Sequence, residues 1–185
     1  MSTPGTQHRN ETRIVADPTL PTIVITREFD APPERVFRAH TDPDLVARWL
    51  GPRRLTMRID RYDAHSGGSY RYAHREDDGT EYGFHGVFHE VRPAERIVQT
   101  FAFDGFPDEV SLETAVFEDL GGRTRLTTTS LMGSVEARDA MIASGMEHGV
   151  RESYERLDEL LDGPSVGPPG GDRSGSADRR ANAEA

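Results

Sequence analysis

Six apolar runs follow one another between residues 55 and 132, and a short turn separates each run from the next. The runs are rich in β-branched and aromatic residues, which is typical of strands in half-buried sheets. The segment DDGT (77–80) between two of them is a strong hairpin turn. We therefore predict an antiparallel meander with strands at 55–63, 69–76, 81–91, 97–104, 110–119 and 123–132.

A further strand and two short helices are predicted before the meander. The strand is TIVITREF (22–29). Pro32-Pro33 marks the start of the first helix, and Asp42 is the expected N-cap of the second, with Pro43 in its first turn. Gly51-Pro52 ends the second helix.

One long helix is predicted after the meander, from about Ser134 to Leu161. Gly145 and Gly149 lie four residues apart on one face of it, although glycine inside a helix costs about 0.5–1 kcal/mol relative to alanine. They indicate either close approach of the helix backbone to the sheet or room left for a ligand. Because helices and strands occupy separate parts of the chain, the fold class is α+β.

The charge and residue content exclude several classes of protein. The formal net charge of −10 disfavours nucleic acid as a partner, and all 22 basic residues are arginine. Cysteine is absent, which excludes disulfides and thiolate chemistry. No apolar run approaches the roughly 20 residues of a membrane span, and the N-terminus lacks the apolar centre of a signal peptide. We expect a cytoplasmic protein that does not associate with membranes.

Both ends of the chain are polar and carry several prolines or glycines. We predict disordered tails at 1–20 and 163–185, because such segments bury too little apolar surface to offset the entropy of ordering. The single folded domain is then 21–162. Acids and arginines balance within the two tails, so the domain carries the whole net charge.

Five phrases together carry a resemblance to a known family. They are FDAPPERVFRAHTDPDLVARWLGP (29–52), DAHSGGSYRY (63–72), EYGFHGVFHEVRPAERIVQTFAF (81–103), RTRLTTTSL (123–131) and SGMEHGVRESYERLDELL (144–161). In order and spacing they resemble the START-like, or SRPBCC, superfamily and within it the bacterial branch related to the C-terminal domain of the heat-shock-protein-90 ATPase activator. The resemblance implies a helix-grip fold, in which a curved sheet wraps around the C-terminal helix. It also implies a cavity between them that binds a small hydrophobic or amphipathic molecule.

Candidate ligand-binding residues come from strand positions that share a face and from the helices. Tyr70, Tyr72 and His74 share one strand face by the period of two. If such side chains point inward, they form an apolar pocket with a few polar groups, although an ordinary core would use the same residues. The predicted set is Trp49, Tyr70, Tyr72, His74, Phe84, Phe88, Phe101, Met141, Met146 and His148.

No metal site and no cofactor is predicted. His85 and His89 share a strand face but lie roughly 13 Å apart, too far to bind one zinc ion. His148 follows Glu147 in EHGVRE, which lacks the H-E-x-x-H spacing that places two imidazoles on one helical face.

Two other functions stay open. Some members of the superfamily act as polyketide cyclases or dehydratases, for which His74, His148, Glu113 and Glu147 are candidate bases. Nothing in their spacing pairs a base with an orienting acid, which argues against an enzyme and leaves the catalytic residues unassigned. We expect Glu113 to pair with Arg125 across strands instead.

The resemblance also allows a chaperone-associated domain that binds a folded protein partner on the convex side of its sheet. That function predicts a filled core without a cavity. A homodimer stays open as well, because an exposed edge strand could pair with a second copy.

Overall fold

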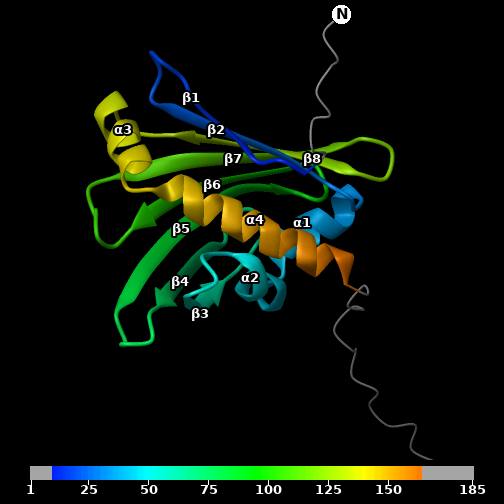
Figure 1. The fold of residues 1–185 in the computed structure, drawn as a ribbon, viewed down its shortest axis with the longest axis horizontal. Helices are drawn as coiled ribbons and strands as arrows, with labels where there is room; N and C mark the ends of the chain where they lie inside the picture. Colours follow the sequence, from blue (N-terminus) through cyan, green and yellow to red (C-terminus); the bar gives the residue numbers. More distant parts are fainter. Residues whose placement is uncertain (1–9, 164–185) are drawn as a thin grey trace, which may run out of the picture.

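The computed structural model describes residues 10–163 as an eight-stranded antiparallel sheet with four helices (Figure 1). The elements are β1 (Arg13–Ala16), β2 (Thr22–Phe29), α1 (Pro33–Thr41), α2 (Pro43–Trp49), β3 (Thr56–Tyr62), β4 (Ser69–Arg75), β5 (Glu81–Arg92), β6 (Arg96–Phe103), β7 (Val110–Asp119), β8 (Thr124–Leu131), α3 (Val135–Ala143) and α4 (Met146–Asp162). This arrangement confirms the predicted α+β class and helix-grip fold. Every strand predicted from the sequence is present.

The strand order in the sheet is β1-β2-β8-β7-β6-β5-β4-β3, and all neighbours are antiparallel. The meander from β3 to β8 therefore stays sequential, and β2 joins it beside the last strand. The sheet is curved, and α4 crosses its concave face (Figure 1). Alternation along the strands fits one covered face, since Phe117 on β7 is buried whereas Val116 beside it is exposed.

The helix starts follow the proline and aspartate signals of the sequence. Pro33 occupies the first turn of α1. The side chain of Asp42 accepts a hydrogen bond from the backbone N–H of Asp44, which makes it the N-cap of α2 as predicted.

The core lies between the centre of the sheet and the C-terminal half of α4. Leu157 on α4 is fully buried, and Tyr154 contacts Phe29 of β2 edge to face with ring centroids 5.6 Å apart. The Tyr154 ring also approaches Trp49 of α2 at 6.2 Å. Burial of these side chains fixes α4 across the sheet.

The predicted N-terminal tail of 1–20 is wrong in its second half, because Arg13–Ala16 form β1 and pair with β2. Pairing with β2, packing of Ile14 against the core and polar contacts on either side of β1 order this segment. Arg138 of α3 donates to the backbone carbonyls of Asp17 and Leu20, and Arg151 of α4 donates to that of Thr12. The tail predictions for 1–9 and 164–185 lie outside the described residues.

The predicted C-terminal helix is wrong in one respect, because it is broken into α3 and α4. Gly145 has φ +81°, a left-handed conformation that glycine adopts without strain, and it starts α4. A Cβ at Gly145 would meet nothing within 4 Å, so close packing does not explain this glycine. At Gly149 a Cβ would meet Pro52 Cγ at 3.8 Å, which is ordinary contact with the loop after α2 and not with the sheet.

Candidate functional site

Aromatic rings form a continuous row on the concave face of β4, β5 and β6. Tyr70 and Tyr72 stack with ring centroids 5.9 Å apart, Tyr72 and Phe84 at 5.3 Å, and Phe84 and Phe101 at 5.5 Å. The two tyrosines are buried, whereas the two phenylalanines are half-buried. The row therefore passes from filled core into a less tightly packed region.

A glycine allows Tyr70 to reach across the sheet. The Tyr70 hydroxyl donates a 2.8 Å hydrogen bond to the backbone carbonyl of Thr100 on β6. Its path crosses Gly86 on β5, where a Cβ would lie 2.7 Å from the Tyr70 hydroxyl oxygen and 1.9 Å from the Thr100 carbonyl oxygen. Any side chain at residue 86 would displace Tyr70 from this position.

Glu113 of β7 is an acidic side chain on the concave face. It shares the face of buried Phe117, four residues along the same strand, and its carboxylate accepts hydrogen bonds from Ser111 (2.7 Å) and Ser130 (2.6 Å). Its partner on the neighbouring strand β6 is Gln99. Burial raises the pKa of Glu113, and the two serine hydroxyls oppose that rise.

The tyrosines beside Glu113 are held in their neutral form. Burial raises the pKa of Tyr70 and Tyr72 well above the usual range, and the charge of Glu113 contributes to both shifts. Tyr154 reaches from α4 to the sheet, where its hydroxyl lies 3.4 Å from Thr128 Oγ1.

We refer to Glu113, Ser111, Ser130 and Gln99 as the Glu113 cluster.

The predicted pairing of Glu113 with Arg125 is wrong. Glu113 lies opposite Ser130 on β8, whereas Arg125 lies opposite Glu118 and pairs with it and with Glu28. Ser130, the partner of Glu113, is five residues from Arg125 on β8. Because side chains alternate along a strand, those of Glu113 and Arg125 lie on opposite sides of the sheet.

His74 lies beside the middle of the aromatic row, in contact with Tyr72 and Phe84 and next to Gly51 in the connection from α2 to β3. Its ring packs on the backbone of Gly51, where a Cβ would come within 2.2 Å of the imidazole. Burial, together with the charge of Arg156, lowers the pKa of His74 to about 4, so the ring is neutral at pH 7. Among residues 10–163 no carboxylate is hydrogen-bonded to this ring, and His74 therefore lacks the orienting acid of a catalytic base.

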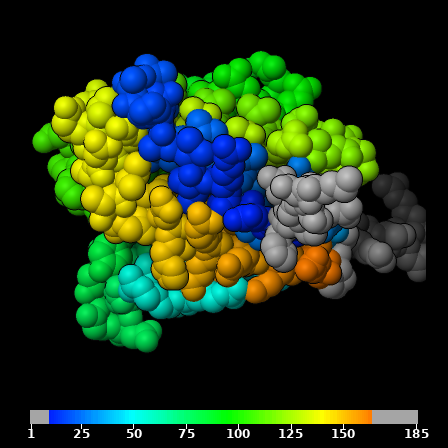
Figure 2. Space-filling model, turned by 45° about the horizontal axis from the view of Figure 1, so that its top comes forward, coloured from blue at the N-terminus to red at the C-terminus, as the bar shows by residue number. Residues whose placement is uncertain are grey.

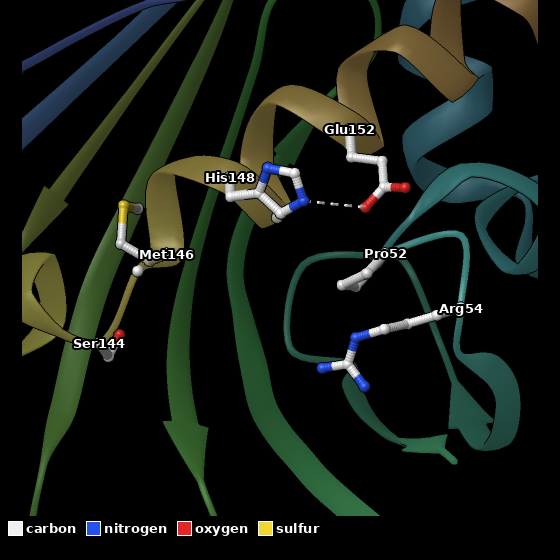
Figure 3. Close-up of a pocket in the computed structure, with 8 residues that line it drawn as sticks. Pro52, Arg54, Ser144, Met146, His148 and Glu152 are labelled. Atoms are coloured by element: carbon white, nitrogen blue, oxygen red, sulfur yellow. Dashed lines mark ion pairs between the residues drawn. The ribbon is translucent and has the colours of Figure 1, made fainter. Parts of the chain in front are cut away.

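A hollow of about 340 Å³ lies beside the N-terminal half of α4 (Figure 3). We call it the α4 hollow. Glu152 points from α4 toward Pro52 and Arg54 on the opposite side, and His148 Nε2 lies 3.9 Å from Glu152 Oε2. The complete lining is Pro52, Arg54, Ser144, Gly145, Met146, His148, Gly149 and Glu152.

Polar contacts hold α4 between the N-terminal segment and the end of α2. Ser153 Oγ accepts from the backbone N–H of Gly51, and Arg156 donates to the carbonyls of Gly51 and Arg48. Figure 2 shows the resulting surface, in which the gold and orange of α4 lie between the blue N-terminal segment and the cyan region near residue 52. These contacts fix the position of α4, which forms one wall of the α4 hollow.

The structure places the predicted site residues in four different surroundings. Trp49 and Phe88 belong to the closed core, where Trp49 Nε1 donates to the carbonyl of Ala39. Met146 and His148 line the α4 hollow, but the His148 side chain is 88% exposed. The aromatic row holds Tyr70, Tyr72, His74, Phe84 and Phe101, and Met141 is half-buried on α3.

Sequence reasoning missed the Glu113 cluster as a unit. The signal was nevertheless present: Ser111 and Glu113 share the face of Phe117 on β7, as Ser130 shares that of Leu126 on β8. Polar residues at positions where strand alternation places core side chains mark a functional site more often than an exposed charge does. What the sequence could not supply was the register that brings Ser130 and Gln99 to Glu113.

Neither a metal site nor a membrane-spanning helix occurs in the described part of the chain. No group of three or more His, Asp or Glu residues there could hold a metal ion. No helix between residues 10 and 163 is long and apolar enough to cross a membrane.

The sequence matches a protein-family model described as Activator of Hsp90 ATPase homolog 1-like protein, over residues 30–162. The chain belongs to this family. A comparison with curated proteins finds no match. The matched region spans α1 to α4 and includes both the aromatic row and the Glu113 cluster.

Solved structures of bacterial proteins share the fold of this family member. A protein of Rhodobacter sphaeroides is 29% identical with a TM-score of 0.74, and the match covers 81% of this chain and 97% of that one. A protein of Arthrobacter aurescens is 28% identical with a TM-score of 0.75, covering 83% and 92%. The protein Ms6760 of Mycobacterium smegmatis is 26% identical with a TM-score of 0.73, covering 81% and 96%.

Proposed function

We propose that the protein binds a small hydrophobic or amphipathic molecule between the concave face of its sheet and the helices α3 and α4. Incomplete burial is the observation that carries this proposal. Phe84 and Phe101 lie on the covered face of the sheet yet are only half-buried, and so are Met141 and Met146 on the covering helices. A ligand in this region would remove their apolar surface from water, which is worth about 25 cal/mol per Å².

The α4 hollow is the proposed opening of this site. Its volume of about 340 Å³ falls within the range of small-molecule sites. Met146 gives the lining an apolar side chain, and Gly149 leaves the helix surface open toward Pro52. Arg54 and Glu152 at its rim would keep the polar end of an amphipathic molecule in contact with water.

Membership of the family supports a helix-grip domain of general ligand-binding type. Nothing in the catalytic geometry favours an enzyme over a binding protein. Two of the four candidate bases lie at the surface of α4, where His148 is exposed and Glu147 lies near Arg151. Of the other two, His74 has no orienting acid and Glu113 is hydrogen-bonded to two serines. We therefore propose binding without an assigned reaction.

Native mass spectrometry of the gently purified protein, followed by solvent extraction, tests this function. We expect a bound compound of definite mass whose occupancy falls in Gly149→Leu, where a large side chain fills the α4 hollow. Gly149→Ala is the matched control, because a methyl group makes only ordinary contact with Pro52.

Two outcomes would count against ligand binding. One is a ligand-free wild-type protein that also fails to bind neutral apolar probes such as 1-naphthylmethanol. The other is a stable complex with a folded protein in place of any small molecule, which would favour the chaperone-associated alternative.

A further inference from the structure

Glu113 has an unusual position for an acidic side chain in this protein. It lies near the middle of the sheet, between Gln99 of β6 and Ser130 of β8, on the face that α4 covers. Each of its two carboxylate oxygens accepts one serine hydroxyl, Oε1 from Ser111 and Oε2 from Ser130. A carboxylate offers about four lone-pair positions, so both oxygens keep capacity for a further donor.

No cationic side chain within residues 10–163 pairs with Glu113. Arg27, on β2 of the same sheet, is bonded to Asp158 and Thr12. This contrasts with the surface acids of the same sheet, such as Glu118 and Glu28, which pair with Arg125. Glu113 is half-buried, so its carboxylate loses part of its hydration without a cation to compensate for the loss.

The groups around Glu113 favour one kind of donor. Gln99, which lies opposite Glu113, has its Nε2 3.5 Å from the Tyr70 hydroxyl, and the rings of Tyr70 and Tyr72 continue into Phe84 and Phe101. Aromatic faces beside a carboxylate are the usual surroundings of an ammonium group, because ring quadrupole and carboxylate both attract positive charge. The net charge of −10 also attracts positively charged ligands over long distances.

We propose that Glu113 is the polar anchor of the interior site and that it selects amphipathic ligands carrying a protonated amine on an apolar body. This inference rests on the proposed function, since it names the ligand class of the same site. Ser111 and Ser130 hold the carboxylate in place, and the ammonium group takes its free lone pairs. The half-buried phenylalanines cover the apolar body of the ligand.

Calorimetric titration with two probes of nearly equal shape tests the selection. The probes are 1-naphthylmethylamine, which is protonated at pH 7, and the neutral 1-naphthylmethanol. We expect the amine to bind the wild-type protein at least about tenfold more tightly, the size of one charge-assisted hydrogen bond. In Glu113→Gln the amine should lose this advantage, while the alcohol keeps its affinity.

Glu118→Gln is the matched control, because it removes the same charge from the same strand on the opposite, exposed face. It should leave the tenfold preference intact. The difference in affinity between the two probes for the wild-type protein can still be measured if a variant fails to fold.

The outcomes separate the two proposals. Equal affinities of the two probes for the wild type, unchanged in Glu113→Gln, would overturn the selection by Glu113 and leave interior binding in place. Equal loss of preference in Glu113→Gln and Glu118→Gln would also overturn it, because net charge alone would then explain the preference. Binding of neither probe would overturn the proposed function itself.

Discussion

The two halves of α4 meet the sheet in different ways. The C-terminal half contributes Tyr154, Leu157 and Leu161, which are all buried against the core and the short helices. The N-terminal half contributes Met146 and Val150, which are only half-buried. We call these regions the packed end and the open end.

The difference indicates that one half of α4 stabilises the fold and the other half contributes to the proposed binding site. Fixing the packed end gives α4 its position, because full burial of large side chains dominates stability. The open end then has apolar surface without complete packing, which is the requirement for a ligand to gain free energy by binding. Stability and proposed function therefore depend on different residues of α4.

Truncation of side chains should give the largest contrast between the two ends. Leu157→Ala, at the packed end, is expected to lower the free energy of unfolding by about 2–5 kcal/mol because it leaves a cavity in the core. Val150→Ala, at the open end, should cost less than about 1 kcal/mol. Urea unfolding followed by circular dichroism measures both, and equal losses would remove the distinction between the ends.

Acid should destabilise the protein through two histidines, His40 and His74, whose rings are shielded from water. His40, which contacts Trp49 and Phe117 at the packed end, has its pKa lowered to about 4 by burial, and so has His74. The unfolded chain takes up these protons near pH 6.5, whereas the folded chain does not. Stability is therefore complete above about pH 6.5 and is lost as the pH falls toward 4, by on the order of 2–3 kcal/mol for each histidine.

The variant His40→Gln should flatten this pH dependence of the urea midpoint by about half, because one of the two protonation sites is gone. Gln can keep the donor to the carbonyl of Val36 that His40 Nδ1 reaches at 2.8 Å. A slope between pH 6.5 and 4 that is the same in wild type and variant would show that the pKa of His40 is not lowered by its surroundings.

The two glycines at the open end should respond in opposite directions to alanine. Gly145→Ala is expected to lose about 1 kcal/mol, since φ of +81° is unfavourable for a residue with a Cβ. Gly149→Ala should gain about 0.5–1 kcal/mol, because helix propensity improves and the added methyl meets only Pro52 Cγ at 3.8 Å. Thermal unfolding distinguishes the signs, and a loss at both positions would mean that the helix is continuous and closely packed there.

The smallest effect is expected at Glu113. Its pKa is raised by burial, so the folded state holds the proton to higher pH than the unfolded state, and stability falls as pH rises above the unfolded value. Glu113→Gln should therefore keep or slightly increase the thermal midpoint at pH 7, because the amide can still bond Ser111 and Ser130. A clear loss of stability would assign Glu113 a structural role.

Most of the fold could be predicted because its signals are local. Alternation within strands, the DDGT turn and the Pro43 helix start each act over a few residues, and the structure agrees with them. The break at Gly145 was predicted as helix interior, since a glycine can serve in a helix or in a left-handed turn and the sequence does not distinguish them. β1 was missed because its order depends on pairing with β2 and on contacts from Arg138 and Arg151, distant in sequence, to the carbonyls on either side of it.

The candidate site was predictable only in part. Strand parity placed Tyr70 and Tyr72 on one face, and they are neighbours in the structure. Whether a side chain on that face is core or site depends on how closely a distant helix packs over it, and parity cannot separate buried Phe88 from half-buried Phe101.

Methyl NMR of the methionines tests the central claim most directly. The chain has five methionines, so the ¹³C-methyl spectrum is simple, and Met→Leu variants assign Met141 and Met146. On titration with 1-naphthylmethanol we expect both methyl resonances to shift along one saturable curve in the wild type and to stay in place in Gly149→Leu. If neither resonance moves up to the solubility limit of the probe, or both move equally in Gly149→Leu, the open end of α4 is not the ligand site.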